Sequence, residues 1–203
     1  MASFEVLSRD FYLPSARVVA PRLLGHLLLR RTGKTLSGGL IVETEAYMRD
    51  DAACHAVNGP TPRNQVMFGA PGHAYVYFIY GVHFCVNAVC EQEGVGEAVL
   101  IRAISVELGL KQMQRLRHVH EPGQLTNGPG KLCQALDIDR ALNGADLCDA
   151  RSRLFIARPA NLEEAKRKLG PVTATTRIGI RKASELPLRF LLAGSPFVSR
   201  KVV

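Results

Sequence analysis

Apolar residues in this chain gather in short runs that are typical of β-strands, and these runs do not alternate regularly with helices. The clearest is residues 74–90, AYVYFIYGVHFCVNAVC, where two apolar and aromatic segments flank a bend near Tyr80 and Gly81. Parallel strands need a long crossover between them, whereas a tight turn joins antiparallel strands. The pattern therefore predicts an α+β fold with a mainly antiparallel sheet and a β-hairpin.

The other patterned segments place helices among the strands. Residues 16–31 begin as an apolar helix that contains Pro21 and continue as a strand. A chain of 203 residues fits one domain with a substantial core, so we expect a single domain over residues 1–203, with helices around the sheet. Further expected elements are two short strands around Gly38-Gly39 in 34–48, a loop at 50–68, a strand at 97–106, a helix at 107–117, a glycine-rich loop opening a helix in 125–138, and a strand and turn in 186–199.

Composition narrows the class of protein. No apolar run approaches the ~20 residues of a membrane-spanning helix, and the first residues lack a signal-peptide pattern, so we expect a cytoplasmic protein without a membrane partner. The five cysteines are odd in number and form no C-x-x-C pair. This usage argues against a disulfide framework or a zinc cage.

The positive charge is unevenly distributed. The formal net charge is +8, and residues 151–203 hold twelve Lys and Arg against three acidic residues. One interpretation is ordinary solvated surface charge. The other is a face that binds a polyanion, because basic surfaces gain affinity for nucleic acid by releasing counterions.

Two glutamates stand in the otherwise apolar strand IVETEAY. Glu43 and Glu45 are two residues apart, so alternation along a strand places them on one face. They could form a solvated strand edge, or one could act as a general base toward water. A third interpretation is a divalent metal site, since carboxylates and imidazole are common ligands. Its ligands would be Glu43, Glu45, Asp50, Asp51 and His55.

The hairpin also has two interpretations. Alternation puts Tyr75 and Tyr77 on one face, while Tyr80 projects from the bend and Gly81 can take the positive φ of a tight turn. The hairpin could simply pack in the core with a tyrosine at the surface. Alternatively, Tyr80 could be an aromatic wedge of the kind that unstacks bases. The segment TNGPGKL fails the Walker pattern, although glycines before a helix suit a backbone phosphate.

Taken together, these segments closely resemble the alkyladenine (3-methyladenine) DNA glycosylase family. Eight stretches match in the family's order, between about residue 7 and residue 199. They are IVETEAY, AACH (52–55), TPRN (61–64), YVYFIYG (75–81), FCVN (84–87), AVLIRA (98–103), GPGKLCQAL (128–136) and PLRFLLAGSPFVS (187–199).

The resemblance implies roles for individual residues. Glu45 matches the general base that activates water, and Tyr80 matches the side chain that fills the gap left in the duplex by a flipped base. The remaining matches fall into two groups. Tyr47, His55, Tyr77, Asn87 and Arg102 match residues of the base pocket, where Asn87 crowds the 2-amino group of guanine and Arg102 lies near the flipped nucleotide and its phosphate; Arg63, Lys131 and Ser195 lie in segments that resemble DNA-backbone contacts.

The resemblance also implies the reaction. Family members flip damaged purines out of double-stranded DNA and hydrolyse the N-glycosidic bond, which leaves an abasic site. We therefore expect a monomeric, monofunctional glycosylase of base excision repair, with no cofactor, no metal and no lyase activity. Two other functions remain open: a non-catalytic DNA-binding module, and a metal-dependent nuclease built on the acidic cluster. Val82, His83 and Phe197 differ from the side chains common in the family, which bears on lesion preference.

Overall fold

One antiparallel sheet organises the computed structural model, which describes residues 4–199. The strand order is β1-β7-β2-β3-β6-β5-β4, with β9 paired to β3 and β8 paired to β9. Every strand pair among the described residues is antiparallel, as the sequence predicted. The strands are β1 Phe4–Val6, β2 Leu27–Thr32, β3 Thr35–Tyr47, β4 Ala74–Ile79, β5 His83–Cys90, β6 Glu97–Leu108, β7 Leu154–Pro159, β8 Val172–Thr175 and β9 Arg189–Leu192.

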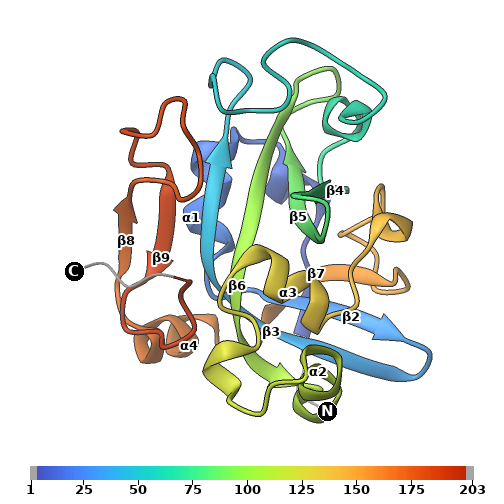
Figure 1. The fold of residues 1–203 in the computed structure, drawn as a ribbon, viewed down its shortest axis with the longest axis vertical. Helices are drawn as coiled ribbons and strands as arrows, with labels where there is room; N and C mark the ends of the chain where they lie inside the picture. Colours follow the sequence, from blue (N-terminus) through green and yellow to red (C-terminus); the bar gives the residue numbers. More distant parts are fainter. Residues whose placement is uncertain (1–3, 200–203) are drawn as a thin grey trace.

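Helices cover both faces of this sheet (Figure 1). Helix α1 packs on β3 and β6 behind the sheet, whereas α3 packs on β5 and β6 in front and contacts α2. The buried side chains of α1 join those of β3, β6 and α3 in the main apolar core. The fold is α+β, as expected. The helices are α1 Ala16–Leu23, α2 Leu110–Arg117, α3 Pro129–Ala135 and α4 Leu162–Leu169. No helix in the described range 4–199 is long and apolar enough to cross a membrane.

The sequence prediction of two short strands around Gly38-Gly39 was wrong. Residues Thr35–Tyr47 form one continuous strand, in which the pairing with β6 shifts by one register step between the two glycines. A Cβ atom on Gly39 would lie 1.5 Å from the Ser105 carbonyl oxygen. The glycines are therefore needed where β2 and β6 approach this strand closely, and they do not end it.

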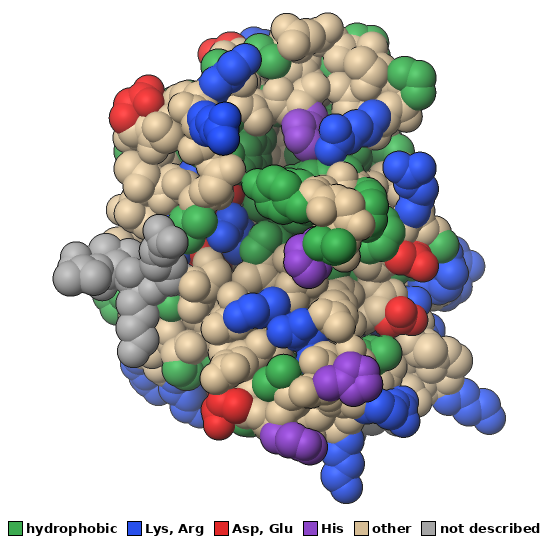
Figure 2. Space-filling model, viewed as in Figure 1, with side chains coloured by type: hydrophobic (Ala, Val, Ile, Leu, Met, Phe, Trp, Pro, Cys, Tyr) green, Lys and Arg blue, Asp and Glu red, His purple; other side chains and the backbone are tan. Residues whose placement is uncertain are grey.

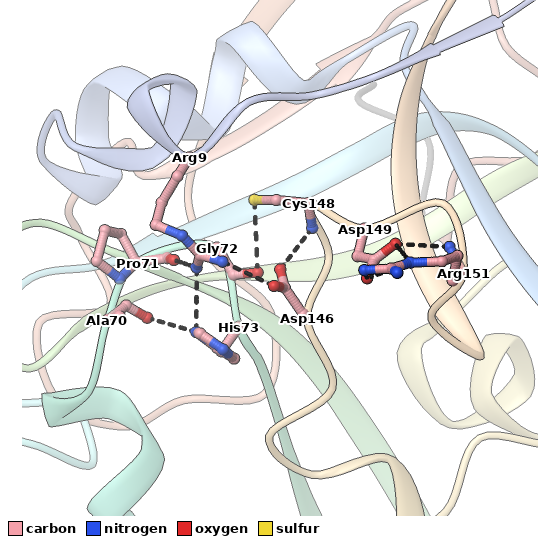
Figure 3. A network of polar contacts seen from close by, with 9 residues as sticks. All are labelled: Arg9, Ala70, Pro71, Gly72, His73, Asp146, Cys148, Asp149 and Arg151. Atoms are coloured by element: carbon pink, nitrogen blue, oxygen red, sulfur yellow. Dashed lines mark hydrogen bonds and ion pairs between the residues drawn. The ribbon is translucent and has the colours of Figure 1, made fainter.

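A polar network fixes the start of the hairpin (Figure 3). Arg9, in the short 3-10 helix Arg9–Tyr12, donates to the Pro71 carbonyl and pairs with Asp146 at 2.7 Å. The Asp146 carboxylate also accepts from the Cys148 amide at 2.8 Å. A bridge between His73 and Asp146 continues this link to the residue before β4. Three segments far apart in sequence thus hold the base of β4 in place.

Candidate active site

An aromatic cavity opens along β4, beside the end of β3 and the middle of β5. Its volume is about 170 Å³, on the order of the ~150 Å³ that accommodates a benzene ring. The lining is apolar or aromatic apart from a few polar groups, which is typical of a site for a flat organic ligand. The residues that line it are Tyr47, Ala53, His55, Met67, Tyr75, Tyr77, Ile79, Asn87, Ala98, Gly179 and Ile180.

Three rings form one wall of this cavity. Tyr75 and Tyr77 stack with centroids 5.3 Å apart, which confirms that they share a face of β4. The His55 ring meets Tyr77 edge-on at 4.6 Å, and its Nδ1 lies 3.0 Å from the Tyr75 hydroxyl. Burial, and then the charge of Arg63, lowers the pKa of His55 below its ordinary value. His55 is therefore a neutral hydrogen-bonding group at the cavity.

Asn87 contributes an amide from β5 to the lining of the cavity. It is buried, and its Nδ2 donates to the Tyr75 carbonyl oxygen at 3.0 Å. That bond fixes the orientation of the amide against the stacked tyrosines. A rigid amide at the cavity wall can select among bases by shape and by hydrogen bonding.

Glu45 lies one hydrogen bond behind the cavity wall. Its side chain is fully buried, and its Oε2 accepts from the Tyr47 hydroxyl at 2.8 Å. Its Oε1 accepts from the Ile178 amide at 2.8 Å and lies 3.2 Å from Nη1 of Arg102. Burial and the neighbouring Glu45 carboxylate raise the pKa of Tyr47, which keeps this phenol protonated as a donor. The carboxylate is thus held rigidly.

A second carboxylate, that of Glu43, helps to hold Arg102 beside Glu45. Glu43 accepts from Nε of Arg102 at 2.9 Å and from Nε of Arg189 at 2.6 Å. The Ser199 amide and hydroxyl donate to it at 2.6 and 2.7 Å. Burial raises the pKa of Glu43, but Arg102, the Ser199 amide and Arg189 outweigh that effect, and the pKa lies below its ordinary value. Glu43 therefore stays ionised and fixes the arginine that faces Glu45.

The hairpin tip projects a tyrosine into solvent. Tyr80 is 77% exposed, and both Tyr80 (φ 53°) and Gly81 (φ 71°) adopt the left-handed conformation. Phe78 and Val82 are also exposed there, so the tip is an apolar group on the surface. Figure 2 shows hydrophobic side chains gathered in the middle of this face, with Lys and Arg side chains around them. An exposed apolar tip with basic surroundings suits contact with a nucleic acid.

Comparison with known proteins identifies the family. The profile described as Methylpurine-DNA glycosylase (MPG) matches residues 10–196. The chain belongs to the methylpurine-DNA glycosylase family. A protein of Methanoculleus marisnigri, described provisionally as a 3-methyladenine DNA glycosylase, is 51% identical over 96% of this chain and 99% of its own length. Proteins with the same description from Rhodopseudomonas palustris (48%; 96% and 88%) and Carboxydothermus hydrogenoformans (45%; 97% and 100%) are also similar.

As a methylpurine-DNA glycosylase, the protein is a DNA repair hydrolase that acts on N-glycosyl bonds. The structure brings five of the residues predicted for the reaction into one region. Tyr47, His55, Tyr77 and Asn87 line the cavity, and Glu45 lies directly behind Tyr47. Val82, His83 and Phe197, which the sequence connected with lesion preference, are not among the residues that line it.

Arg102 lies beside Glu45 and does not line the cavity. The resemblance implied a place in the base pocket near the nucleotide phosphate; the side chain is buried and contacts both Glu43 and Glu45. Its Nη2 also donates to the Ser199 hydroxyl at 3.3 Å. Because two carboxylates contact its guanidinium, the position of Arg102 relative to Glu45 is fixed.

The three predicted DNA-backbone residues lie in different surroundings. Arg63 is exposed and its guanidinium lies 5.5 Å from the Tyr77 ring centroid, at the rim of the cavity. Lys131 is exposed in the first turn of α3 and donates to Asn127 at 2.9 Å. Ser195, by contrast, is 3% exposed and its hydroxyl accepts from the Phe197 amide. A direct contact of the Ser195 hydroxyl with DNA is therefore not supported.

The metal-site interpretation does not fit this geometry. In the described residues, no three or more His, Cys, Asp and Glu side chains gather closely enough to hold an ion. Glu43 and Glu45 instead face Arg102, and Asp51 pairs with Arg177. Carboxylates that are satisfied by guanidinium groups are poor candidates for cation ligands.

Sequence reasoning missed the segment that closes the site. The Ile178 amide holds Glu45, and Gly179 and Ile180 form part of the cavity wall. Arg177 anchors this segment by its bond to Asp51, which lies 126 residues earlier in the sequence. No periodicity or motif marks residues 177–180, so only the folded chain reveals them.

Proposed function

We propose that this glycosylase removes damaged purines, of the 3-methyladenine, hypoxanthine and ethenoadenine class, from double-stranded DNA. In this proposal a monomer in the cytoplasm, formed by a single domain over residues 1–203, flips the nucleotide and hydrolyses its N-glycosidic bond. The supporting observation is the fully buried Glu45 carboxylate, held one hydrogen bond behind an aromatic cavity and on the same sheet as an exposed tyrosine wedge.

Base flipping requires a site that binds the base and a group that replaces it. Extrusion costs a few kcal/mol, and stacking of a base on an aromatic side chain returns ~1–3 kcal/mol. Tyr77 and His55 offer the flipped purine two rings in the cavity. Tyr80 extends from the tip of the same hairpin and would occupy the vacated space in the duplex.

Glu45 would activate the attacking water. Each carboxylate oxygen has two lone pairs, so Oε2 can accept from a water as well as from Tyr47. The carboxylate would take a proton as the water attacks C1′ of the sugar. Its negative charge would also stabilise the oxocarbenium-like transition state.

The cavity would set the choice of base. A purine alkylated at N3 carries positive charge and leaves readily, whereas hypoxanthine must gain a proton. Asn87, fixed by its bond to Tyr75, would crowd the 2-amino group of guanine. No lysine is among the described residues that line the cavity. This lining favours hydrolysis over a Schiff base with the sugar, and hence a product strand that stays intact.

The proposal is tested by base release under single-turnover conditions. Duplexes would carry one 3-methyladenine, hypoxanthine or ethenoadenine, and the buffer would contain EDTA. We expect release of free base, with strand cleavage only after alkali. Strand scission without alkali, loss of activity in EDTA, or tight binding without release of any of the three bases would contradict the proposal.

A further inference from the structure

Arg177 and Asp51 form an ion pair that is closed off from solvent. Both side chains are fully buried, and two guanidinium nitrogens of Arg177 contact the two carboxylate oxygens of Asp51. The same guanidinium donates to the carbonyls of Ala46 at 3.0 Å and Ala183 at 3.2 Å. It also lies 4.7 Å from the ring centroid of Tyr47. One side chain therefore joins the end of β3, the loop at Asp51 and residues 177–183.

Such a pair is a poor device for stability alone. Desolvation of two charges offsets much of their attraction in a protein interior. Here, in addition, Nε of Arg177 is buried with no hydrogen-bond partner among the described residues. The bidentate geometry does fix position, because it holds a planar group by several directional bonds.

The residues that follow Arg177 reach the site directly. The Ile178 amide donates to Oε1 of Glu45 at 2.8 Å. Gly179, at a φ of 78°, and Ile180 then form part of the cavity wall. A shift of the Arg177 guanidinium would therefore move both the donor to Glu45 and the wall beside the base.

We propose that Arg177, through its ion pair with Asp51, is a positioning residue for Glu45. It sets the Ile178 amide so that the carboxylate faces the sugar, and it holds Gly179 and Ile180 against the flipped base. The buried side chain of Arg177 touches no substrate, so it acts through Ile178 and Tyr47. This inference rests on the proposed function, since it concerns the group that activates water there.

A double-mutant cycle tests this coupling. We expect Arg177→Lys to slow single-turnover base release by about 100-fold, the order of loss for small misplacements of reacting groups, and to weaken binding of lesion DNA by a smaller factor, through the wall at Gly179 and Ile180. In a Glu45→Gln background the same substitution should slow base release only slightly further, because the effects of residues that act as a unit are not additive. An equal loss in both backgrounds would overturn the proposal.

The matched control is another Arg–Asp pair. Asp149 and Arg151 contact each other at 2.9 Å at the surface (Figure 3), and neither residue lines the cavity. Asp149→Asn should leave base release unchanged, whereas Asp51→Asn should reproduce the effect of Arg177→Lys. Equal rates for Asp51→Asn and Asp149→Asn would contradict the proposal.

Amide hydrogen exchange separates this inference from the proposed function. Asp51→Asn should speed exchange in residues 177–183 while the amides of β2 and β7 keep their protection, whether or not the protein releases base. Absence of base release by the wild type would defeat the proposed function alone. Unchanged exchange in residues 177–183 would defeat the role of the pair, whatever the activity.

Discussion

Two glutamates on one strand have different surroundings at the scale of single residues. Glu43 accepts from two arginines and from both polar groups of Ser199, so its acceptor sites are occupied by fixed donors. Among residues 4–199, Glu45 shares Arg102 with it and otherwise accepts from a phenol and one amide. The first is suited to hold charge in place, and the second retains capacity for a water.

A buried histidine makes folding sensitive to acid. His26 is 4% exposed, packs edge-on against Phe11 and has no partner at Nδ1 among the described residues. Burial, followed by the charge of Lys166, lowers its pKa from 6.5 to about 4. The unfolded chain therefore binds a proton at higher pH than the folded one, so this contribution to stability is complete above pH 6.5 and is lost as the pH falls toward 4.

The difference between the pKa of His26 in the folded and in the unfolded chain leads to a prediction about stability. When the pH is lowered from 7.5 to 5, protonation of His26 in the unfolded chain should lower the free energy of unfolding by about 2 kcal/mol, at ~1.36 kcal/mol per pKa unit. Urea denaturation at the two pH values measures it. His26→Phe, which has no proton to bind, should lose that much less on acidification. If both proteins lose the same free energy, the histidine is not the cause.

At the scale of elements, the hairpin packs on one face and forms the cavity on the other. Val76 and Val86 lie in the main core, while Tyr75 and Tyr77 belong to the aromatic wall. Alternation along β4 produces this division, which is why the sequence predicts it. At the tip, Tyr80 holds a left-handed conformation that costs ~1–2 kcal/mol for a residue with a side chain.

Strain at the hairpin tip gives a prediction that separates stability from activity. Tyr80→Gly relieves the left-handed strain, so the melting temperature should stay the same or rise. Base release from a lesion duplex should fall roughly 5- to 150-fold, since the lost stacking is worth ~1–3 kcal/mol. Thermal unfolding and single-turnover kinetics measure the two effects. Tyr80→Phe keeps the ring and should behave as wild type; a rate for Tyr80→Gly equal to wild type would exclude the wedge.

At the scale of the whole molecule, the site is assembled from segments that only the fold brings together. Glu43 meets Ser199 across 156 residues of sequence, and Asp51 meets Arg177 across 126. The chain has 26 Lys and Arg, and nothing local marks which of them will pair with a given carboxylate. These contacts could not be predicted from sequence.

Short-range sequence patterns predicted many of the other features of the fold and the site. The bend at Tyr80-Gly81 predicted the hairpin, and period-2 alternation predicted the common face of Tyr75 and Tyr77 and that of Glu43 and Glu45, because neighbours in a strand determine each of these features. The same local reasoning wrongly predicted that the strand ends at Gly38-Gly39, where in fact the close approach of other strands requires glycine. The family resemblance, not local periodicity, placed Ser195 in a segment similar to DNA-backbone contacts, and folding buries that side chain.

The central claim is that Glu45 performs the chemistry and does not merely support the fold. Single-turnover base release from a hypoxanthine duplex, measured beside the Kd for the same duplex, tests it with wild type and Glu45→Gln. The account predicts that the variant binds as tightly as wild type and releases base at least ~100-fold more slowly, as expected for loss of a general base. A variant that releases base at the wild-type rate would contradict it.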